Sequence, residues 1–375
     1  MGRSRLLNEY ENPMSTRGTS LPDEYVGLSD ERVEERIRGK RAEYGSRLVL
    51  LAHHYQRKEI VRLADFRGDS YGLSKRASQQ SSELIVFCGV HFMAESADVL
   101  TRDDQRVYLP NMAARCPMAD MASPADVEVA WEGLREVLGP GAALPVLYIN
   151  SVAELKTFCG NEGGTVCTSS NAKAAVEWGL RRAKRVLFLP DEHLGRNTGK
   201  RLGIPRERMV VWDPDQPLGG VERRELEKAS IILWKGHCHV HTWFTAEHVR
   251  AVRASFPAVK VVVHPECREE VVDLADASGS TEFIVGYVQS SPPGSIIAIG
   301  TEVNLVSRLA EEHPDKRVFE LSRSLCPNMF RINLKNLLWT LESLDESTLV
   351  RVAPELKPGA RLALDRMLTI SEARK

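Results

Sequence analysis

Short runs of apolar residues alternate with longer amphipathic stretches over most of the chain. The runs are short for helices and rich in Val, Ile and Leu, which favours strands. They cover residues 48–52, 84–88, 145–149, 186–189, 231–234, 259–263 and 296–299. Continuously apolar strands that alternate with helices are typical of parallel sheets buried on both faces. The pattern therefore predicts an α/β protein.

Two helices and a tail are predicted outside this alternation. Residues 29–44 are highly charged with few apolar positions, which indicates a helix on the surface. Residues 362–368 have the pattern of an amphipathic helix that packs by one face. The first 18 residues contain no apolar segment, so we expect a mobile tail and no secretory signal. No stretch approaches the ~20 apolar residues that a membrane span requires.

A set of polar features recurs three times along the chain. Three apolar runs end in a polar residue, and a cluster of hydroxyl side chains follows each run 17 to 19 residues later, at the expected start of a helix. The strand-end residues are His53, Asn150 and His264, and the hydroxyl residues are Ser70, Ser169, Ser280 and Thr281. Chance recurrence of similar α/β units is the alternative, but several features recur in the same order. We therefore predict a threefold repeat.

Each repeat also reaches a cysteine after its last strand. Cys116 and Cys326 lie 63 and 62 residues after their strand-end histidines, whereas Cys238 lies 88 residues after Asn150. The longer interval predicts an insertion between Asp191 and Cys238. Functional groups in parallel sheets gather at the C-terminal ends of the strands. Three units around a pseudo-threefold axis would therefore bring the three cysteines to one point.

The repeat predicts three similar α/β units with parallel sheets, whose strand-end groups would meet at a pseudo-threefold axis. A tail and surface helix would precede them, and a helical segment would follow. The predicted boundaries are 1–45, 46–139, 140–257, 258–345 and 346–375.

Composition narrows the class of protein. The 375 residues are 43% hydrophobic, enough for several domains. Lys and Arg total 50 against 51 Asp and Glu, and a net charge of −1 argues against binding to nucleic acid or anionic membranes. Seven cysteines, an odd number in a long chain, do not indicate a disulfide framework. A reducing, cytoplasmic location is therefore expected.

The three cysteines suggest a metal centre. Thiolates suit iron–sulfur clusters and zinc. Three cysteines on a [4Fe–4S] cluster leave one iron without a protein ligand, and this iron can act as a Lewis acid on substrate oxygens. Zinc held by the 237–241 run is an alternative, although it leaves Cys116 and Cys326 unexplained. His239 and His241 are interpreted as solvated or hydrogen-bonded residues near the site. A second alternative is an iron or redox sensor, which would not need the polar strand ends.

The other polar strand-end residues suit a small anionic substrate. Hydroxyls and backbone N–H groups at helix starts can bind carboxylate or phosphate. Donors, acceptors and a general base would come from His53, Tyr55, Tyr148, Asn150, His264 and Glu266. The remaining thiols are predicted to be ordinary buried residues, since cysteine packs as a small hydrophobe. They are Cys88, Cys159, Cys167 and Cys267, and Cys167 is expected to end a strand.

A series of motifs resembles the quinolinate synthases of the longer bacterial type. The resemblance runs from about residue 48 to 343. Its main motifs are AHHYQ (52–56), GDSYGLS (68–74), VFCGVHFMAESA (86–97), LPNMAARCPMAD (109–120), YINSVAELK (148–156), TSSNA (168–172), FLPDEHLGRNTG (188–199), WKGHCHVH (234–241), VHPEC (263–267), DLADASGSTEFI (273–284), IGTEVNL (299–305) and CPNM (326–329).

The resemblance implies a fold and an activity. The implied fold is three similar α/β/α sandwich domains with small parallel sheets around a pseudo-threefold axis, with the active site at their junction. The activity is that of a transferase that condenses iminoaspartate with dihydroxyacetone phosphate to quinolinate. Phosphate and two waters are released, in de novo NAD biosynthesis. L-aspartate oxidase would be an upstream partner, and no nucleic acid or membrane is involved.

The resemblance also assigns residues. The [4Fe–4S] cluster would have three cysteine ligands, Cys116, Cys238 and Cys326, and one open iron. Catalytic roles fall on Tyr55, Tyr148, His264 and Glu266, and we assign proton transfer to Glu266. Substrate binding falls on His53, Ser70, Tyr148, Asn150, Ser169, His264, Glu266, Ser280 and Thr281. Pro-Asn-Met follows Cys326 where some relatives carry a second cysteine, so thiol switching beside the cluster is not expected.

Overall fold

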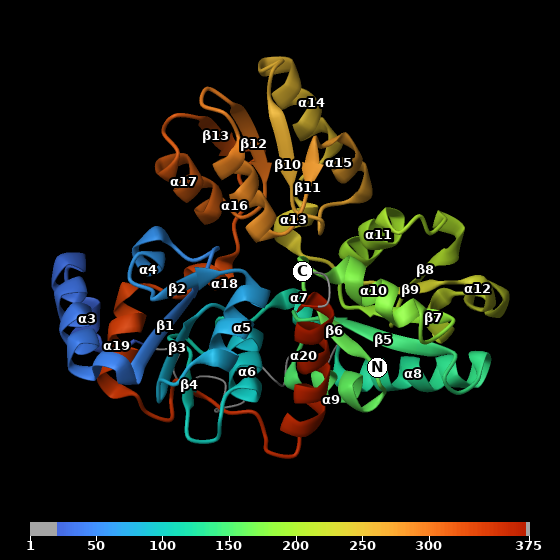
Figure 1. Ribbon diagram of the computed structural model, residues 1–375, viewed down its shortest axis with the longest axis horizontal. Coiled ribbons are helices and arrows are strands. Elements are labelled where there is room, and N and C mark those ends of the chain that lie inside the picture. Colours follow the sequence, from blue (N-terminus) through green and yellow to red (C-terminus); the bar gives the residue numbers. More distant parts are fainter. Residues whose placement is uncertain (1–20, 373–375) are drawn as a thin grey trace. The chain divides into compact units, whose positions relative to one another are not determined.

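The computed structural model describes residues 21–372 and contains three small, mostly parallel sheets (Figure 1). The predicted α/β class is confirmed, whereas the predicted N-terminal tail lies outside the described residues. The described chain forms two compact units, residues 21–116 with 326–352, and residues 117–325 with 353–372. The domain boundaries predicted from the sequence stay a prediction.

The first unit holds one sheet, in the order β14-β4-β3-β1-β2. Its strands are β1 (Leu48–His53), β2 (Phe66–Gly68), β3 (Leu84–Cys88), β4 (Arg106–Tyr108) and the antiparallel edge strand β14 (Leu349–Val350). Its helices are α2 (Asp23–Val26), α3 (Asp30–Tyr44), α4 (Lys58–Val61), α5 (Ser70–Gln79), α6 (His91–Leu100), α18 (Pro327–Phe330) and α19 (Leu334–Ser343). A 3-10 turn, η2 (Gly45–Arg47), leads into β1.

Helix α3 is the charged helix predicted over residues 29–44. Ser29 caps it by accepting a hydrogen bond from the Arg32 N–H at 3.4 Å. Most of its residues face solvent, but Val33 and Ile37 are fully buried. Arg36 pairs with Glu342 of α19, which ties the charged side of α3 to that helix.

The second unit holds the other two sheets. The middle sheet has the order β6-β5-β7-β9-β8, and the remaining sheet has the order β11-β10-β12-β13. The strands of the middle sheet are β5 (Ala143–Tyr148), β6 (Thr165–Cys167), β7 (Arg185–Leu189), β8 (Met209–Trp212) and β9 (Ile231–Trp234). The other strands are β10 (Lys260–Val263), β11 (Ala277–Ser278), β12 (Ile296–Gly300) and β13 (Arg317–Glu320).

Helices cover both faces of these two sheets. Those around the middle sheet are α7 (Pro117–Asp120), α8 (Pro124–Leu138), α9 (Ala153–Asn161), α10 (Ala172–Leu180), α11 (Glu192–Arg201), α12 (Arg223–Lys228) and α20 (Lys357–Glu372), with the 3-10 turns η3 (Arg206–Arg208) and η4 (Pro217–Gly220). After β9 come α13 (His239–Thr242), α14 (Ala246–Ser255), α15 (Glu269–Leu274), α16 (Thr281–Ser290) and α17 (Val303–Glu312). Figure 1 shows α14 and α15 on one face of the β10 sheet and α16 and α17 on the other.

All three sheets share one strand order. In each, the first strand of the repeat lies between the second and the third, and a fourth parallel strand extends the sheet beyond the third. The middle sheet carries one additional edge strand, β8, which comes from the segment between Asp191 and Cys238. The shared order supports the predicted repeat, and β8 accounts for the predicted insertion.

The C-terminal helix α20 packs closely on α9. Ala360, Ala363, Leu364 and Met367 are fully buried, which confirms the predicted packing role of this segment. A methyl group added at Gly160 would overlap the carbonyl oxygen of Gly359, so the two backbones touch at this point. The glycine is therefore required by the helix crossing and not by a turn.

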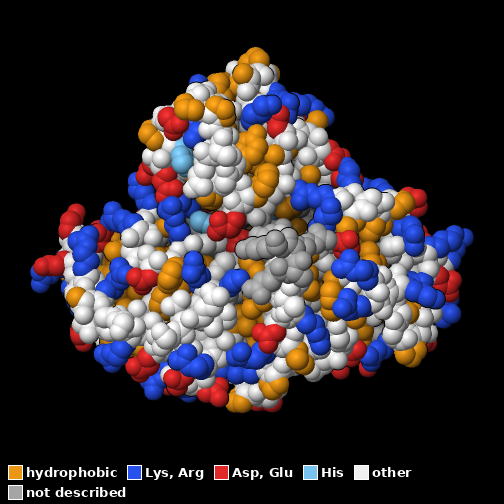
Figure 2. Space-filling view, in the orientation of Figure 1, with side chains coloured by type: hydrophobic (Ala, Val, Ile, Leu, Met, Phe, Trp, Pro, Cys, Tyr) orange, Lys and Arg blue, Asp and Glu red, His pale blue; other side chains and the backbone are white. Residues whose placement is uncertain are grey.

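Charges of both signs are interspersed over the face drawn in Figure 2. The picture agrees with the near equality of basic and acidic residues in the sequence. Among residues 21–372, no helix has the length and apolar character needed to cross a bilayer.

We predict opposite effects for two glycine substitutions in helices. Gly160→Ala should lower the free energy of unfolding by about 1–3 kcal/mol, because it forces α9 and α20 apart. Gly39→Ala in α3 should raise it by up to about 1 kcal/mol, since nothing lies within 4 Å of the added methyl group. Urea unfolding of both variants is the measurement. Equal effects would contradict the close crossing of α9 and α20.

Candidate active site

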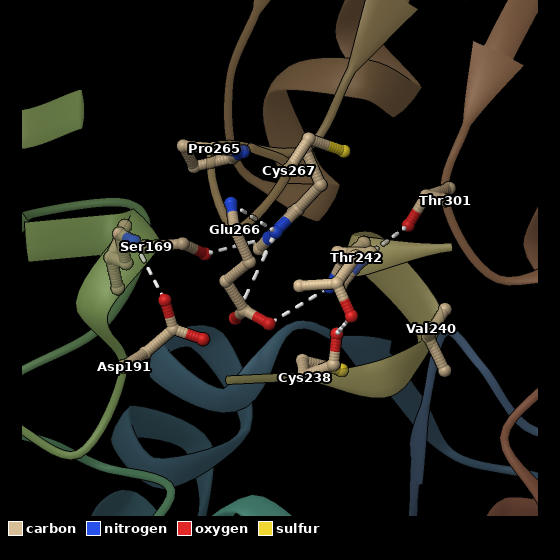
Figure 3. A network of polar contacts seen from close by, with 12 residues as sticks. Ser169, Asp191, Cys238, Val240, Thr242, Pro265, Glu266, Cys267 and Thr301 are labelled. Atoms are coloured by element: carbon tan, nitrogen blue, oxygen red, sulfur yellow. Dashed lines mark hydrogen bonds and ion pairs between the residues drawn. The ribbon is translucent and has the colours of Figure 1, made fainter. Parts of the chain in front are cut away.

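A buried polar network lies at the C-terminal ends of several strands of the second unit (Figure 3). Tyr148 ends β5, His264 and Glu266 follow β10, and Thr301 follows β12. His241 comes from the short helix α13, which begins directly after Cys238. Strand ends of two sheets thus supply the network, as expected for a site in parallel α/β sheets.

The Glu266 carboxylate is the centre of this network. It is 2% exposed, and each of its oxygens has a partner. The Tyr148 hydroxyl donates to Oε1 at 2.5 Å, and His241 Nδ1 lies 2.8 Å from Oε2. A buried carboxylate is stable only when its oxygens are hydrogen-bonded or paired with charge, and these two contacts provide that compensation.

Two imidazole rings stack beside the carboxylate. The His241 and His264 ring centroids are 4.3 Å apart with an interplanar angle of 18°. His241 Nε2 contacts Thr301 Oγ1 at 3.1 Å. The Glu266 N–H donates to His264 Nδ1 at 3.4 Å, so the ring hydrogen of neutral His264 belongs on Nε2, which donates to Ser169 Oγ at 3.2 Å.

The environment separates the protonation states of these groups. Burial alone would raise the pKa of Glu266, but the His241 imidazole and the hydrogen bonds from His241 and Tyr148 lower this pKa to about 2. Burial lowers the pKa of His264 from 6.5 to about 3, and His241 contributes to the fall. The structure therefore favours an ionised Glu266 beside a neutral His264.

Asp191 is a second buried carboxyl group near Glu266. Its Oδ1 accepts a hydrogen bond from the Leu194 N–H at 2.6 Å at the start of α11. Its Oδ2 has no hydrogen-bond partner among the described residues. Burial raises the pKa of Asp191 well above its usual 3.8, and the Glu266 charge raises it further. Asp191 is therefore the member of this pair that favours the protonated form.

The structure joins four of the predicted site residues of this unit into the network. These are Tyr148, Ser169, His264 and Glu266. Asn150 follows β5, and its buried Oδ1 has no hydrogen-bond partner in the described chain. Ser280 caps α16 by accepting from the Phe283 N–H at 3.3 Å, and Thr281 begins that helix. The hydroxyl of Ser280 thus has a local structural role.

The predicted site residues of the first unit repeat part of this geometry. His53 ends β1, and the Tyr55 N–H donates to His53 Nδ1 at 3.2 Å, as the Glu266 N–H does to His264. The rings of His53 and Tyr55 meet edge to face with centroids 4.8 Å apart. Ser70 is the first residue of α5, which Asp69 caps. The strand-end histidine and the residue two positions later therefore form a recurring local motif.

His241 is hydrogen-bonded near the site, which is one of the two states expected from the sequence. The sequence did not indicate that this residue is buried and in direct contact with Glu266. Cys238 and His241 are three residues apart, and such residues share one face of a helical turn. This interval was the available signal. Asp191 and Thr301 were also missed. Asp191 lies two residues after β7 and Thr301 directly after β12, and these strand-end positions were the signal.

The seven cysteines fall into two classes. Cys88, Cys159, Cys167 and Cys267 are buried, as predicted, and Cys167 ends β6. Burial raises the pKa of both Cys88 and Cys159 to about 12, which makes them unreactive thiols. The other three are partly exposed, and each directly precedes a four-residue helix: Cys116 before α7, Cys238 before α13 and Cys326 before α18.

Cys238 lies close to the network. One donor atom each from Cys238, His241 and Glu266 can be chosen so that all three lie within 4.8 Å of one another. Thiolate, imidazole and carboxylate are the ligand types that transition metals accept. The residues around Cys238 are therefore compatible with a metal centre.

A buried carboxylate, two imidazoles and a phenol at the strand ends of an α/β fold are typical of an enzyme active site. Comparison with known proteins gives the family. The profile of the family described as Quinolinate synthetase A protein matches residues 35–369, and the chain belongs to this family.

Curated relatives support the assignment over nearly the whole chain. The quinolinate synthase of Acidobacterium capsulatum is 52% identical over 356 residues, which cover 93% of this chain and 95% of that protein. The quinolinate synthase of Corynebacterium glutamicum is 49% identical over 94% of this chain and 91% of its own length. That of Rhodopirellula baltica is 48% identical over 92% and 93%.

The neutral state of His264 predicts a specific pH dependence of stability. The folded-state pKa is depressed to about 3, so below the ordinary value of 6.5 the unfolded chain binds a proton that the folded chain does not. The free energy of unfolding is therefore unaffected by His264 above about pH 6.5. It falls as the pH drops below this value, by about 2 kcal/mol at pH ~5. Urea unfolding at several pH values should show this loss for the wild type and not for His264→Gln. Identical pH profiles would mean that His264 binds its proton as readily in the folded chain as in the unfolded chain.

Proposed function

We propose that this chain is a transferase that condenses iminoaspartate with dihydroxyacetone phosphate to form quinolinate, with release of phosphate and two waters. This reaction would serve NAD biosynthesis in the cytoplasm, with L-aspartate oxidase as the upstream source of iminoaspartate. The observation that carries the proposal is the buried Glu266 carboxylate with its Tyr148 and His241 partners. The family and its relatives' names supply the product.

The proposed cofactor is a [4Fe–4S] cluster held by Cys116, Cys238 and Cys326. These three are the partly exposed thiols of the described chain, and they share the same position before a short helix. Soft thiolate donors fit an iron–sulfur cluster, so the residues present suit the group. A cluster with three protein ligands keeps one iron open and supplies a Lewis acid for substrate oxygens.

Glu266 is the proposed proton carrier. Ring closure with loss of two waters requires protons to be removed from carbon or nitrogen and delivered to departing oxygens. A carboxylate that is ionised at neutral pH can accept such a proton at Oε1 or Oε2. The hydroxyl of Tyr148 and the ring of His241 are already hydrogen-bonded to those two oxygens. They hold the carboxylate in one orientation and can exchange the proton with it.

The other residues are assigned to substrate binding. Neutral His264 donates from Nε2, where Ser169 is its present partner, so this hydrogen can be offered to a substrate carboxylate. The buried Oδ1 of Asn150 requires a donor, which a substrate N–H or hydroxyl would supply. Thr281 at the start of α16 is assigned to anion binding. Binding roles for His53, Tyr55, Ser70 and Ser280 rest on the resemblance.

A single zinc ion is the competing proposal for the metal centre. The proximity of Cys238, His241 and Glu266 favours it, because catalytic zinc uses three protein ligands of these types. It would leave Cys116 and Cys326 without a role, although they share the local setting of Cys238. Metal analysis after anaerobic purification separates the two: about four irons with sulfide support the cluster, and zinc alone contradicts it.

We predict that Cys238→Ala, Cys116→Ala and Cys326→Ala each abolish cluster assembly. The proposed cluster has only three protein ligands for its four irons, so the loss of one would leave two irons without a protein ligand. Cys159→Ala is the matched control, since this thiol is fully buried and chemically inert, and its iron content should equal the wild type. Iron and sulfide are measured on the purified proteins. A full cluster in Cys238→Ala would exclude the three-cysteine assignment.

A second prediction tests Glu266 as the general base. Glu266→Gln keeps the size of the side chain but removes the group that accepts a proton. We expect an intact cluster and a rate of quinolinate formation lower by about two to four orders of magnitude. Iron content, melting temperature and turnover are measured on one preparation. Near wild-type turnover with an intact cluster would remove Glu266 from the mechanism, and loss of the cluster would indicate a structural role.

A further inference from the structure

Helix α11 lies unusually close to the middle sheet. Methyl groups added at Gly195 and Gly199 would overlap side chains of β7, β8 and β9, including Phe188, Met209 and Leu233. The two glycines are four residues apart and therefore share one face of the helix. The side of α11 that faces the sheet thus carries no side chain at these positions, and the sheet fixes the helix axis.

Asn197 lies midway between these glycines and projects from the opposite side of α11. It is 2% exposed. Its Nδ2 donates to the carbonyl oxygens of Pro265 and Cys267, each at 2.8 Å. These carbonyls belong to the residues on either side of Glu266. One amide group is therefore hydrogen-bonded to the backbone on both sides of the proposed base.

Helix α11 has further polar contacts with this part of the chain. Arg201 donates to the Ser278 carbonyl oxygen at 2.6 Å, and Lys200 forms exposed ion pairs with α15. Lys200 Nζ lies 2.6 Å from Asp273 and 3.2 Å from Glu269, and its side chain is 45% exposed. Exposed ion pairs between long side chains contribute little to stability and do not fix the distance between the segments that they join. The buried Asn197 amide, by contrast, has short hydrogen bonds with fixed directions. It is the contact that can set the position of the turn.

We propose that Asn197 is a positioning residue that holds the 265–267 turn and thereby aims the Glu266 carboxylate at Tyr148 and His241. This inference rests on the proposed role of Glu266. The turn also has an internal hydrogen bond from the Cys267 N–H to the His264 carbonyl, so it keeps its shape without Asn197. Asn197 determines where the 265–267 turn lies relative to the middle sheet, which contains Tyr148.

The kinetic test uses Asn197→Ala, with Lys200→Ala as the matched control from the same helix and the same contact region. Displacement of a reactive group by about 1 Å can cost about 10²-fold in rate. The iron-loaded Asn197→Ala enzyme should therefore lose about 10²-fold in kcat, with little change in KM and normal iron content. Lys200→Ala should retain wild-type kcat. Wild-type kcat in Asn197→Ala would overturn the proposal.

A double-mutant cycle shows whether Asn197 acts through Glu266. If it does, Asn197→Ala should have almost no further effect on kcat once Glu266 is Gln. Additive losses would overturn the positioning role. If Glu266→Gln alone keeps full activity, the role of Glu266 fails, and the aiming of its carboxylate fails with it.

Hydrogen exchange supplies a measurement that does not depend on turnover. Backbone amides of residues 264–268 should exchange faster in Asn197→Ala, and also in Asn197→Asp, which keeps the shape but lacks the donor. Lys200→Ala should exchange like the wild type in this segment. Unchanged exchange in both Asn197 variants would overturn the proposal that Asn197 holds the turn, even in a protein that makes no quinolinate. Faster exchange in such a protein would show that Asn197 does hold the turn and that the proposed function is wrong.

Discussion

The compensation of one buried carboxylate is the constraint on which the site depends. Removing a charged carboxylate from water costs several kcal/mol unless hydrogen bonds and opposite charge replace the lost solvent. Glu266 obtains this replacement from Tyr148 at the end of β5 and from His241 in α13. Its own segment follows β10. Three segments of the second unit must therefore be in place before this charge is stable.

The same constraint explains why polar residues gather around Glu266. His241 is kept in orientation by Thr301, and His264 by the Glu266 backbone N–H on one side and Ser169 on the other. Asn197 holds the turn from the side of α11. Each contact fixes a direction and not merely a distance. The proposed proton transfer by Glu266 requires such orientation, because proton transfer needs a base within hydrogen-bond reach.

The sequence predicted the long buried strands and the positions of the helix starts. Strands such as β1, β3 and β9 are continuously buried, so apolar runs mark them almost residue by residue. Strands β2, β6 and β11 have only two or three residues, which is too short for a periodic signal, and they were not predicted as sheet members, although the end of β6 at Cys167 was. The repeat predicted the residues near these short strands, because its equal spacing can be recognised even where one strand cannot.

Contacts within the site were less predictable than its members. Tyr148, Ser169, His264 and Glu266 could be named because each lies at or just beyond the end of a strand. The direction in which a side chain points depends on helix phase and on neighbouring sheets, neither of which is visible in linear order. The contact of His241 with Glu266 was therefore not foreseen. Ser280 caps α16, and its role in substrate binding stays a prediction. Asn197 could not be identified as a partner of the 265–267 turn, because the contact spans about 70 residues.

The most direct test of the account is product formation by the purified protein itself. Anaerobically purified, iron-loaded protein is incubated with iminoaspartate and dihydroxyacetone phosphate, and quinolinate and phosphate are quantified together. Both products should appear in equal amounts, and neither should appear when one substrate is omitted. Iron-loaded, folded protein that releases no quinolinate from this mixture would contradict the account.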